Sequence, residues 1–107
     1  MPHDFERQRK ETEWAWNDIN ARAPIPRLID LDIQFVEDDG SGNWNDCEKA
    51  LRLAGYKTNI YDDGSTLEVN VPSTDGQLEN IWHHEERTTQ IALRYGFRPD
   101  GWGFLRE

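Results

Sequence analysis

The sequence predicts an α+β domain of four strands and two helices, preceded by one further helix. Segments in which apolar and polar residues alternate, as in half-buried strands, are interleaved with segments of helical periodicity. Stretches rich in Gly, Pro and Asp separate these segments. After residue 27 their order is strand–helix–strand–strand–helix–strand, which is typical of an antiparallel sheet with helices on one face.

The first helix is expected over residues 4–22, which contain neither Gly nor Pro and in which charges alternate in sign. Trp16 and Ile19 lie three residues apart and therefore share one face of this helix. Trp14 lies away from that face, so the helix is expected to contact two surfaces or to pack against a second subunit.

A proline-containing linker follows, because Pro24 and Pro26 lie two residues apart and a helix cannot continue through them. We therefore divide the chain into an N-terminal helix with its linker, residues 1–27, and a main domain, residues 28–107. The whole chain has 107 residues, which is enough for one hydrophobic core but not for two.

The first strand of the main domain is expected over residues 28–36, where the alternating apolar residues are Ile29, Leu31, Ile33 and Phe35. An acidic loop over residues 37–42 leads to a helix over residues 45–54. Asn45 is expected to cap that helix, with Glu48 reaching back, and Gly55 is expected to end it. Cys47 falls beside apolar positions and is interpreted as a small buried residue rather than a nucleophile.

A hairpin is expected next, with strands over residues 56–61 and 66–71 joined by the turn Asp62-Asp63-Gly64-Ser65. Pro72 and Ser73 are expected to end its second strand. Thr74 and Gln77 form a predicted capping box for a long helix that ends near residue 95. The last strand is expected over residues 97–105, with an interruption over residues 99–103.

These elements predict a ferredoxin-like βαββαβ sandwich, in which a four-stranded antiparallel sheet carries two helices on one face and the N-terminal helix is additional. The closing step Asp100-Gly101-Trp102-Gly103 places a large indole between two glycines, which suits a turn or a close backbone approach. We expect Asp100 and Trp102 to organise a sheet edge.

The formal net charge of −9 is concentrated in the middle of the chain, where residues 28–76 hold eleven acidic and three basic side chains. Such a field repels nucleic acid and anionic membranes and favours a basic protein partner. An acidic surface also serves solubility alone. The mean hydropathy of −0.93 implies a modest core, in which the aromatic residues account for much of the buried area.

The location of the protein is predicted from its single cysteine and from its apolar segments. One cysteine cannot form an internal disulfide, no apolar stretch is long enough for a transmembrane helix, and the first residues contain no apolar signal segment. We therefore expect a cytoplasmic protein.

Two groups of side chains invite a catalytic or metal-binding interpretation, and solvent or partner contact explains both more simply. His83 and His84 are adjacent on a helix and point about 100° apart, so they cannot share a metal ion well. Asp30 and Asp32 share the polar face of a strand, but acid–base catalysis also requires a cleft and a shifted pKa. We expect no catalytic residue, no metal and no cofactor.

Five features together resemble the regulator of ribonuclease E activity B family: the order of elements, the alternating first strand, the helix ending in Ala54-Gly55-Tyr56, the long second helix, and the closing Asp100-Gly101-Trp102-Gly103. The resemblance covers about residues 28–105, and the N-terminal helix departs from the family pattern. It implies a non-enzymatic bacterial protein that binds ribonuclease E and inhibits RNA cleavage by contacting the enzyme rather than the RNA.

The function expected from these observations is that of an acidic protein-binding module. Its predicted interface consists of loop acids at strand ends, namely Glu37, Asp38, Asp39, Asp62 and Asp63. Two alternatives stay open. One is a small enzyme or ligand-binding domain with a cleft between the sheet and the N-terminal helix, lined by Asp30, Asp32, His83 or His84. The other is a structural homodimer in which Trp14 and Trp16 pack across subunits.

Overall fold

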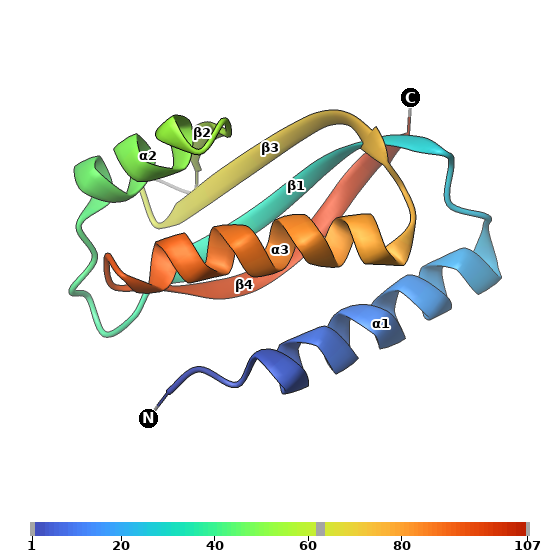
Figure 1. Cartoon of the computed structure of the whole chain (residues 1–107), viewed down its shortest axis with the longest axis horizontal. Helices are drawn as coiled ribbons and strands as arrows, with labels where there is room; N and C mark the ends of the chain where they lie inside the picture. The colour runs from blue at the N-terminus through green and yellow to red at the C-terminus, as the bar shows by residue number, and fades with distance from the viewer. Residues whose placement is uncertain (1, 62–63, 107) are drawn as a thin grey trace.

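The computed structural model describes residues 2–61 and 64–106, which form three helices and four strands (Figure 1). The helices are α1 (Phe5–Arg22), α2 (Trp44–Leu53) and α3 (Leu78–Leu93). The strands are β1 (Leu28–Glu37), β2 (Lys57–Tyr61), β3 (Thr66–Asp75) and β4 (Phe97–Arg106). The predicted α+β class and the predicted helix before the sheet are confirmed.

The four strands form one antiparallel sheet in the order β2-β3-β1-β4, so the first strand of the main domain lies at its centre. The predicted alternation explains this position, because the inward side chains of β1 are fully buried: Ile29, Leu31, Ile33 and Phe35. Helices α2 and α3 cover the face to which these side chains point (Figure 1). The arrangement is compatible with a ferredoxin-like sandwich.

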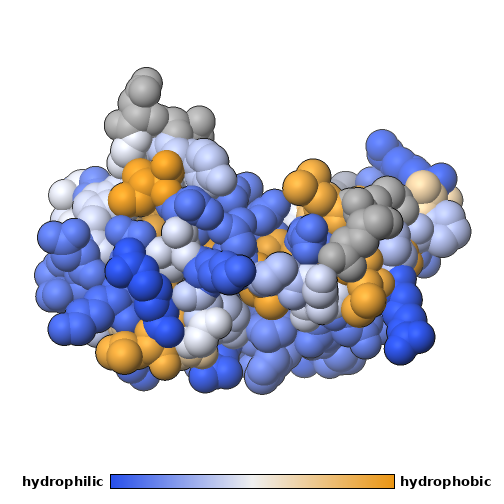
Figure 2. All heavy atoms as spheres, turned by 90° about the horizontal axis from the view of Figure 1, so that it is seen from above, coloured by the Kyte–Doolittle hydropathy of each residue, from blue (hydrophilic) through white to orange (hydrophobic). Residues whose placement is uncertain are grey.

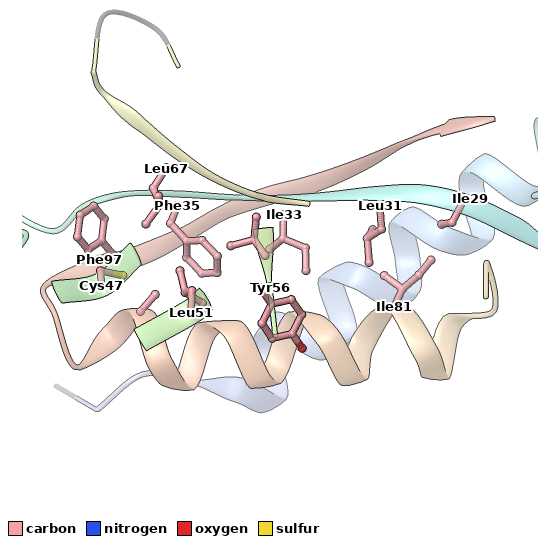
Figure 3. Close-up of a cluster of buried hydrophobic side chains, with 12 residues drawn as sticks. Ile29, Leu31, Ile33, Phe35, Cys47, Leu51, Tyr56, Leu67, Ile81 and Phe97 are labelled. Carbon is pink, nitrogen blue, oxygen red and sulfur yellow. The ribbon is translucent and has the colours of Figure 1, made fainter. Parts of the chain in front are cut away.

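The core lies between β1 and α3, and α2 closes one end of it (Figure 3). Ile81 of α3, Leu51 of α2 and Phe97 of β4 are fully buried against the β1 side chains. Full burial of each such side chain stabilises the fold by about 1.5–3 kcal/mol. Cys47 is also fully buried, as predicted. Its burial, with a smaller effect of the Glu48 carboxylate, raises the pKa of the thiol to about 12.

The predicted cap of α2 is wrong by two residues. Asn43 is the N-cap, and its Oδ1 accepts a hydrogen bond from the Asp46 backbone N–H at 3.2 Å. The helix begins early because Trp44 packs edge-on against Phe97, with ring centroids 4.8 Å apart. Glu48 does not reach back to the cap, since its carboxylate accepts a hydrogen bond from the Thr58 hydroxyl at 2.7 Å.

The predicted end of β3 at Pro72 is also wrong, because the strand continues to Asp75. Ile29 pairs with Thr74 while Leu31 pairs with Val71, so Pro72 and Ser73 form a bulge. A bulge suits Pro72, which has no N–H to donate to the ladder. The Asp30 carboxylate accepts the Ser73 backbone N–H at 2.9 Å and holds the bulge in place.

The extended β3 delays the start of α3, so the predicted capping box does not form. The N-cap is Gln77, whose side chain makes no capping hydrogen bond. Thr74 instead accepts a hydrogen bond from Asn80 Nδ2 at 2.8 Å. The predicted interruption of the last strand is a single bulge at Asp100, because Gln34 pairs with Gly101 and Phe35 pairs with Pro99.

Helix α1 lies alongside α3, on the same side of the sheet as the other helices (Figure 1). Trp16 fixes its C-terminal half, because the indole N–H donates to the Gly76 carbonyl at 2.9 Å. Trp14 is 71% exposed, so the two tryptophans face different surroundings, as their spacing predicted. Within the described residues, none of the helices is both long and apolar enough to cross a membrane.

Candidate functional site

The sheet face opposite the helices is open and presents polar side chains from all four strands. We call it the acidic sheet face and define it by Asp30, Asp32, Gln34, Lys57, Asn59, Tyr61, Glu68, Asn70 and Asp100. The residues of β1 and β3 face outward because they alternate with buried residues of the same strands. Tyr61 and Asp100 belong to the same face because they line one hollow with Gln34 and Glu68. The face thus holds four carboxylates and one lysine. A second basic residue, Arg98, pairs with Val36 at one end of the face.

A series of hydrogen bonds fixes the centre of the acidic sheet face. The Asn70 amide nitrogen donates to Asp32 Oδ1 at 2.5 Å and to Glu68 Oε1 at 2.9 Å. Its amide oxygen accepts from Asn59 Nδ2 at 2.6 Å, and Gln34 Nε2 donates to the second Glu68 oxygen at 3.3 Å. Neutral amides therefore position these carboxylates without cancelling their charge.

The carboxylates of this face take part in no ion pair among the described residues. Five ion pairs occur among the described residues, and all join helical side chains: Arg7–Glu11, Arg9–Glu79, Lys10–Glu6, Arg22–Asp18 and Arg52–Glu48. None of these pairs includes a carboxylate of the acidic sheet face. The four carboxylates of the acidic sheet face thus lie close together without an ion-pair partner among the described residues.

The pKa shifts on the acidic sheet face agree with a high density of negative charge there. Partial burial raises the pKa of Asp32, the hydrogen bond from Asn70 opposes that change, and the charges of Glu68 and Asp30 add to it. The Glu68 charge is the first cause of the raised pKa of the Tyr61 phenol. A cation placed beside these groups would relieve their mutual repulsion.

A shallow hollow of about 280 Å³ lies on the acidic sheet face, lined by Gln34, Tyr61, Thr66, Glu68 and Asp100. Glu68 and Asp100 contribute carboxylates to its lining, and Tyr61 contributes its ring, which is about half exposed. Carboxylates accept hydrogen bonds from guanidinium or ammonium groups, and aromatic rings attract the same cations. The hollow is therefore suited to the end of an arginine or lysine side chain.

The loop acids that the sequence predicted as an interface are placed only in part. Asp38 and Asp39 follow β1 and are exposed. Glu37 is partly buried, and its carboxylate accepts the Trp44 indole N–H at 2.6 Å, so it also positions α2. Asp62 and Asp63 lie outside the described residues.

The side chains named for a catalytic cleft are not brought together. Asp30 and Asp32 belong to the acidic sheet face, whereas His83 and His84 lie on α3. His84 Nδ1 lies 2.9 Å from the Tyr56 hydroxyl, and burial lowers its pKa, with smaller effects from His83 and Arg87. Among the residues that the structure describes, no group of three or more His, Cys, Asp and Glu side chains could hold a metal ion.

Helix α1 is attached to α3 by a buried polar cluster. The Thr12 hydroxyl donates to Glu85 Oε1 at 2.5 Å. Gln8 Nε2 donates both to Glu85 Oε2 and to Thr89 Oγ1, each at 3.1 Å. Glu85 is only 2% exposed, and this burial raises its pKa, which the hydrogen bonds from Thr12 and Gln8 partly oppose.

A second concave site, which we call the α1 pocket, lies between α1, α3 and β4. It has a volume of about 230 Å³ and is lined by Gln8, Glu11, Thr12, Ala15, Glu85, Pro99, Gly101 and Trp102. A cleft between the sheet and the N-terminal helix is therefore present, but none of Asp30, Asp32, His83 and His84 lines it. Trp102 pairs with Ile33 and so faces the helices, which places part of the closing Asp100-Gly101-Trp102-Gly103 step in this pocket.

Sequence reasoning missed Glu85, although a signal was present. It lies four residues after Ile81 and four before Thr89, within the buried face of α3. An isolated carboxylate at such a position indicates a buried polar contact. Gln8 and Thr12 lie four apart on α1 and are the side chains that meet it.

Large exposed apolar side chains are spread over the molecule: Trp14, Leu28, Leu53, Ile60, Tyr61 and Leu105. The surface seen in Figure 2 is mostly hydrophilic, and its apolar side chains form small separate groups.

The sequence matches no protein-family model, and no curated protein is significantly similar to it.

Proposed function

We propose that this chain is a non-enzymatic, ferredoxin-like protein-binding module whose acidic sheet face binds a basic segment of a partner protein. The observation that supports it most is the grouping of carboxylates without ion-pair partners on one face of the sheet. Five acids of the helices form ion pairs, whereas the four carboxylates that the sheet face brings together form none among the described residues. A partner's basic side chain supplies the missing counter-charge.

The hollow on this face gives the proposal a specific contact. An arginine or lysine side chain that enters it meets Glu68 and Asp100 as acceptors and the Tyr61 ring as a cation–π partner. The amides of Gln34 and Asn70 hold Glu68 in position before the partner arrives. Such preorganisation reduces the entropy lost on binding.

Ribonuclease E is the first candidate partner, because of the resemblance to the regulator of ribonuclease E activity B family. Inhibition through the enzyme rather than through its RNA agrees with the charge of the face, since an acidic surface repels phosphates. We propose that the predicted loop acids add to the negative charge of the chain and speed the encounter with a basic partner: Glu37, Asp38, Asp39, Asp62 and Asp63. We propose a cytoplasmic location for this interaction.

Calorimetric titration of purified ribonuclease E at low and high salt tests the proposal. The double variant Glu68→Gln/Asp100→Asn is expected to bind at least about tenfold more weakly, since two charge-assisted hydrogen bonds are lost. Its binding should also depend less steeply on salt. Glu6→Gln/Glu79→Gln, which removes two exposed helical acids, is the matched control and should bind like the wild type.

The outcomes distinguish an error in the proposed interface from an error in the proposed partner. If the double variant binds as tightly as the wild type, the acidic sheet face is not the interface. If ribonuclease E does not bind but an arginine-rich peptide binds in a manner that depends on Glu68 and Asp100, the partner is wrong and the surface is right.

Self-association is a second candidate, favoured by the 71% exposure of Trp14. This indole borders a hollow on α1 that Arg7, Lys10, Glu11 and Ala15 also line. A homodimer through α1 would cover it. Light scattering should then give a dimer mass for the wild type and a monomer mass for Trp14→Ala, and a monomeric wild type at high concentration would exclude the dimer.

A further inference from the structure

We infer that the α1 pocket binds a small organic cation, that is, an ammonium or guanidinium group on a compact apolar stem. The inference is independent of the protein-binding proposal, because the α1 pocket and the acidic sheet face lie on opposite sides of β4. Trp102, which lines the pocket, pairs with the inward-facing Ile33, whereas Asp100 lines the hollow with Gln34.

The pocket is open in part because two of its lining residues are small. Ala15 of α1 and Gly101 of β4 leave space, and Trp102 and Pro99 form an apolar wall. Its volume of about 230 Å³ exceeds the roughly 150 Å³ of a cavity that accepts benzene, and drug-sized ligands need about 300 Å³ or more. The ligand is therefore about one ring with a short substituent.

The polar wall of the pocket is acidic. Glu85 and Glu11 line it, and no Lys or Arg is among its lining residues. Glu85 forms no ion pair within the described part of the chain, and its oxygens accept one hydrogen bond from Thr12 and one from Gln8. A carboxylate has about four acceptor sites, so Glu85 retains capacity for a donor that enters the pocket.

Trp102 supplies the second recognition element. An indole ring is the aromatic group that attracts cations most strongly. A carboxylate and an indole that line one pocket favour a cation over a neutral or anionic molecule of the same shape. This combination selects the chemical class of the ligand.

Because Glu85 can lose a proton, binding of a cation beside it should be linked to proton release. Burial raises the pKa of Glu85, hydrogen bonds from Thr12 and Gln8 oppose that change, the charge of Glu11 adds to it and His3 lowers it. A bound cation provides the counter-charge and lowers this pKa. Binding should therefore release protons and tighten as the pH rises through the pKa of Glu85 in the free protein.

Three probes of one shape test the inference: benzylamine, benzyl alcohol and benzoate. Their binding to the full chain is followed by two-dimensional NMR through the Trp102 indole N–H and the Ala15 and Gly101 amides. Benzylamine is expected to shift these signals and to bind about tenfold more tightly than benzyl alcohol, because only the cation forms a charge-assisted contact. Benzoate should leave the signals unchanged.

Substitutions assign the preference to the pocket. Glu85→Gln should remove the advantage of benzylamine over benzyl alcohol while binding of the alcohol persists. Glu13→Gln, which alters an exposed acid of α1 outside the pocket, should keep that advantage. Should Glu85→Gln fail to fold, Glu11→Gln is expected to reduce the advantage in its place.

Two results would overturn the inference. Equal affinity of the wild type for benzylamine and benzyl alcohol would identify the pocket as an ordinary packing gap. Absence of shifts at Trp102, Ala15 and Gly101 with millimolar benzylamine would show that the pocket takes no such ligand.

Discussion

Thr12 of α1 and Glu85 of α3 are joined by a hydrogen bond of 2.5 Å, and both side chains are buried. Gln8 is the other buried residue of α1, so polar contacts and Trp16, rather than a broad apolar stripe, attach this helix. The position of α1, and with it the α1 pocket, therefore depends on a small number of named interactions.

Thr12→Val should weaken the docking of α1. The substitution keeps the shape of the side chain but removes the donor to Glu85, and an unsatisfied buried acceptor costs about 1–3 kcal/mol. Urea denaturation should show a loss of this size in the free energy of unfolding, and hydrogen exchange should accelerate in α1. Glu13→Gln is the control on the exposed side of the helix, and an equal loss in both variants would contradict the account.

Glu85→Gln should change the pH dependence of stability. The pKa of Glu85 is raised in the folded state, so its favourable contribution is complete below the pKa of an unfolded glutamate and is lost as the pH rises through the folded pKa. The substituted amide cannot ionise, so the wild type should lose stability relative to this variant from acidic to neutral pH. Denaturation curves across that range measure the difference, and a difference that is constant with pH would be incompatible with a buried titrating carboxyl.

The two tryptophans of α1 should respond differently to the same change. Trp16→Phe removes the hydrogen bond to the Gly76 carbonyl, which is worth about 0.5–1.5 kcal/mol, together with some packing. Trp14→Phe alters an exposed ring and should change the free energy of unfolding by less than about 0.5 kcal/mol. Urea denaturation of both variants measures these changes. A larger loss of unfolding free energy for Trp14→Phe than for Trp16→Phe would mean that α1 packs through the face that carries Trp14.

Cys47 should be inert in the folded protein. Its thiol is fully buried and has a pKa of about 12, so neither access nor the thiolate form favours reaction. A thiol reagent such as Ellman's reagent should react rapidly only after denaturant is added. Rapid stoichiometric reaction of the native protein would show that α2 opens readily.

The order of elements could be predicted because its signals are local. β1 alternates with period two through Ile33 and Phe35, and this pattern needs no knowledge of the rest of the chain. The helix cap could not be predicted in the same way. Asn43 and Asn45 are both suitable caps, and the choice depends on contacts of Trp44 with Glu37 and Phe97. Continuation of β3 beyond Pro72 likewise depends on Asp30, a residue of another strand.

The candidate sites were predictable to different degrees. Asp30 and Asp32 were expected on a polar strand face, and they lie on one. Their association with Glu68 and Asp100 could not be expected, because strand register and a bulge decide it. The α1 pocket was equally hidden, since the burial of Glu85 depends on how α1 packs against α3.

NMR titration of the labelled chain with an arginine-rich peptide shows whether the acidic sheet face binds a basic segment. We expect shifts confined to the acidic sheet face, centred on Glu68, Tyr61 and Asp100, that weaken at high salt and in Glu68→Gln/Asp100→Asn. Shifts that map instead to the helices, or that persist unchanged in the double variant, would contradict it.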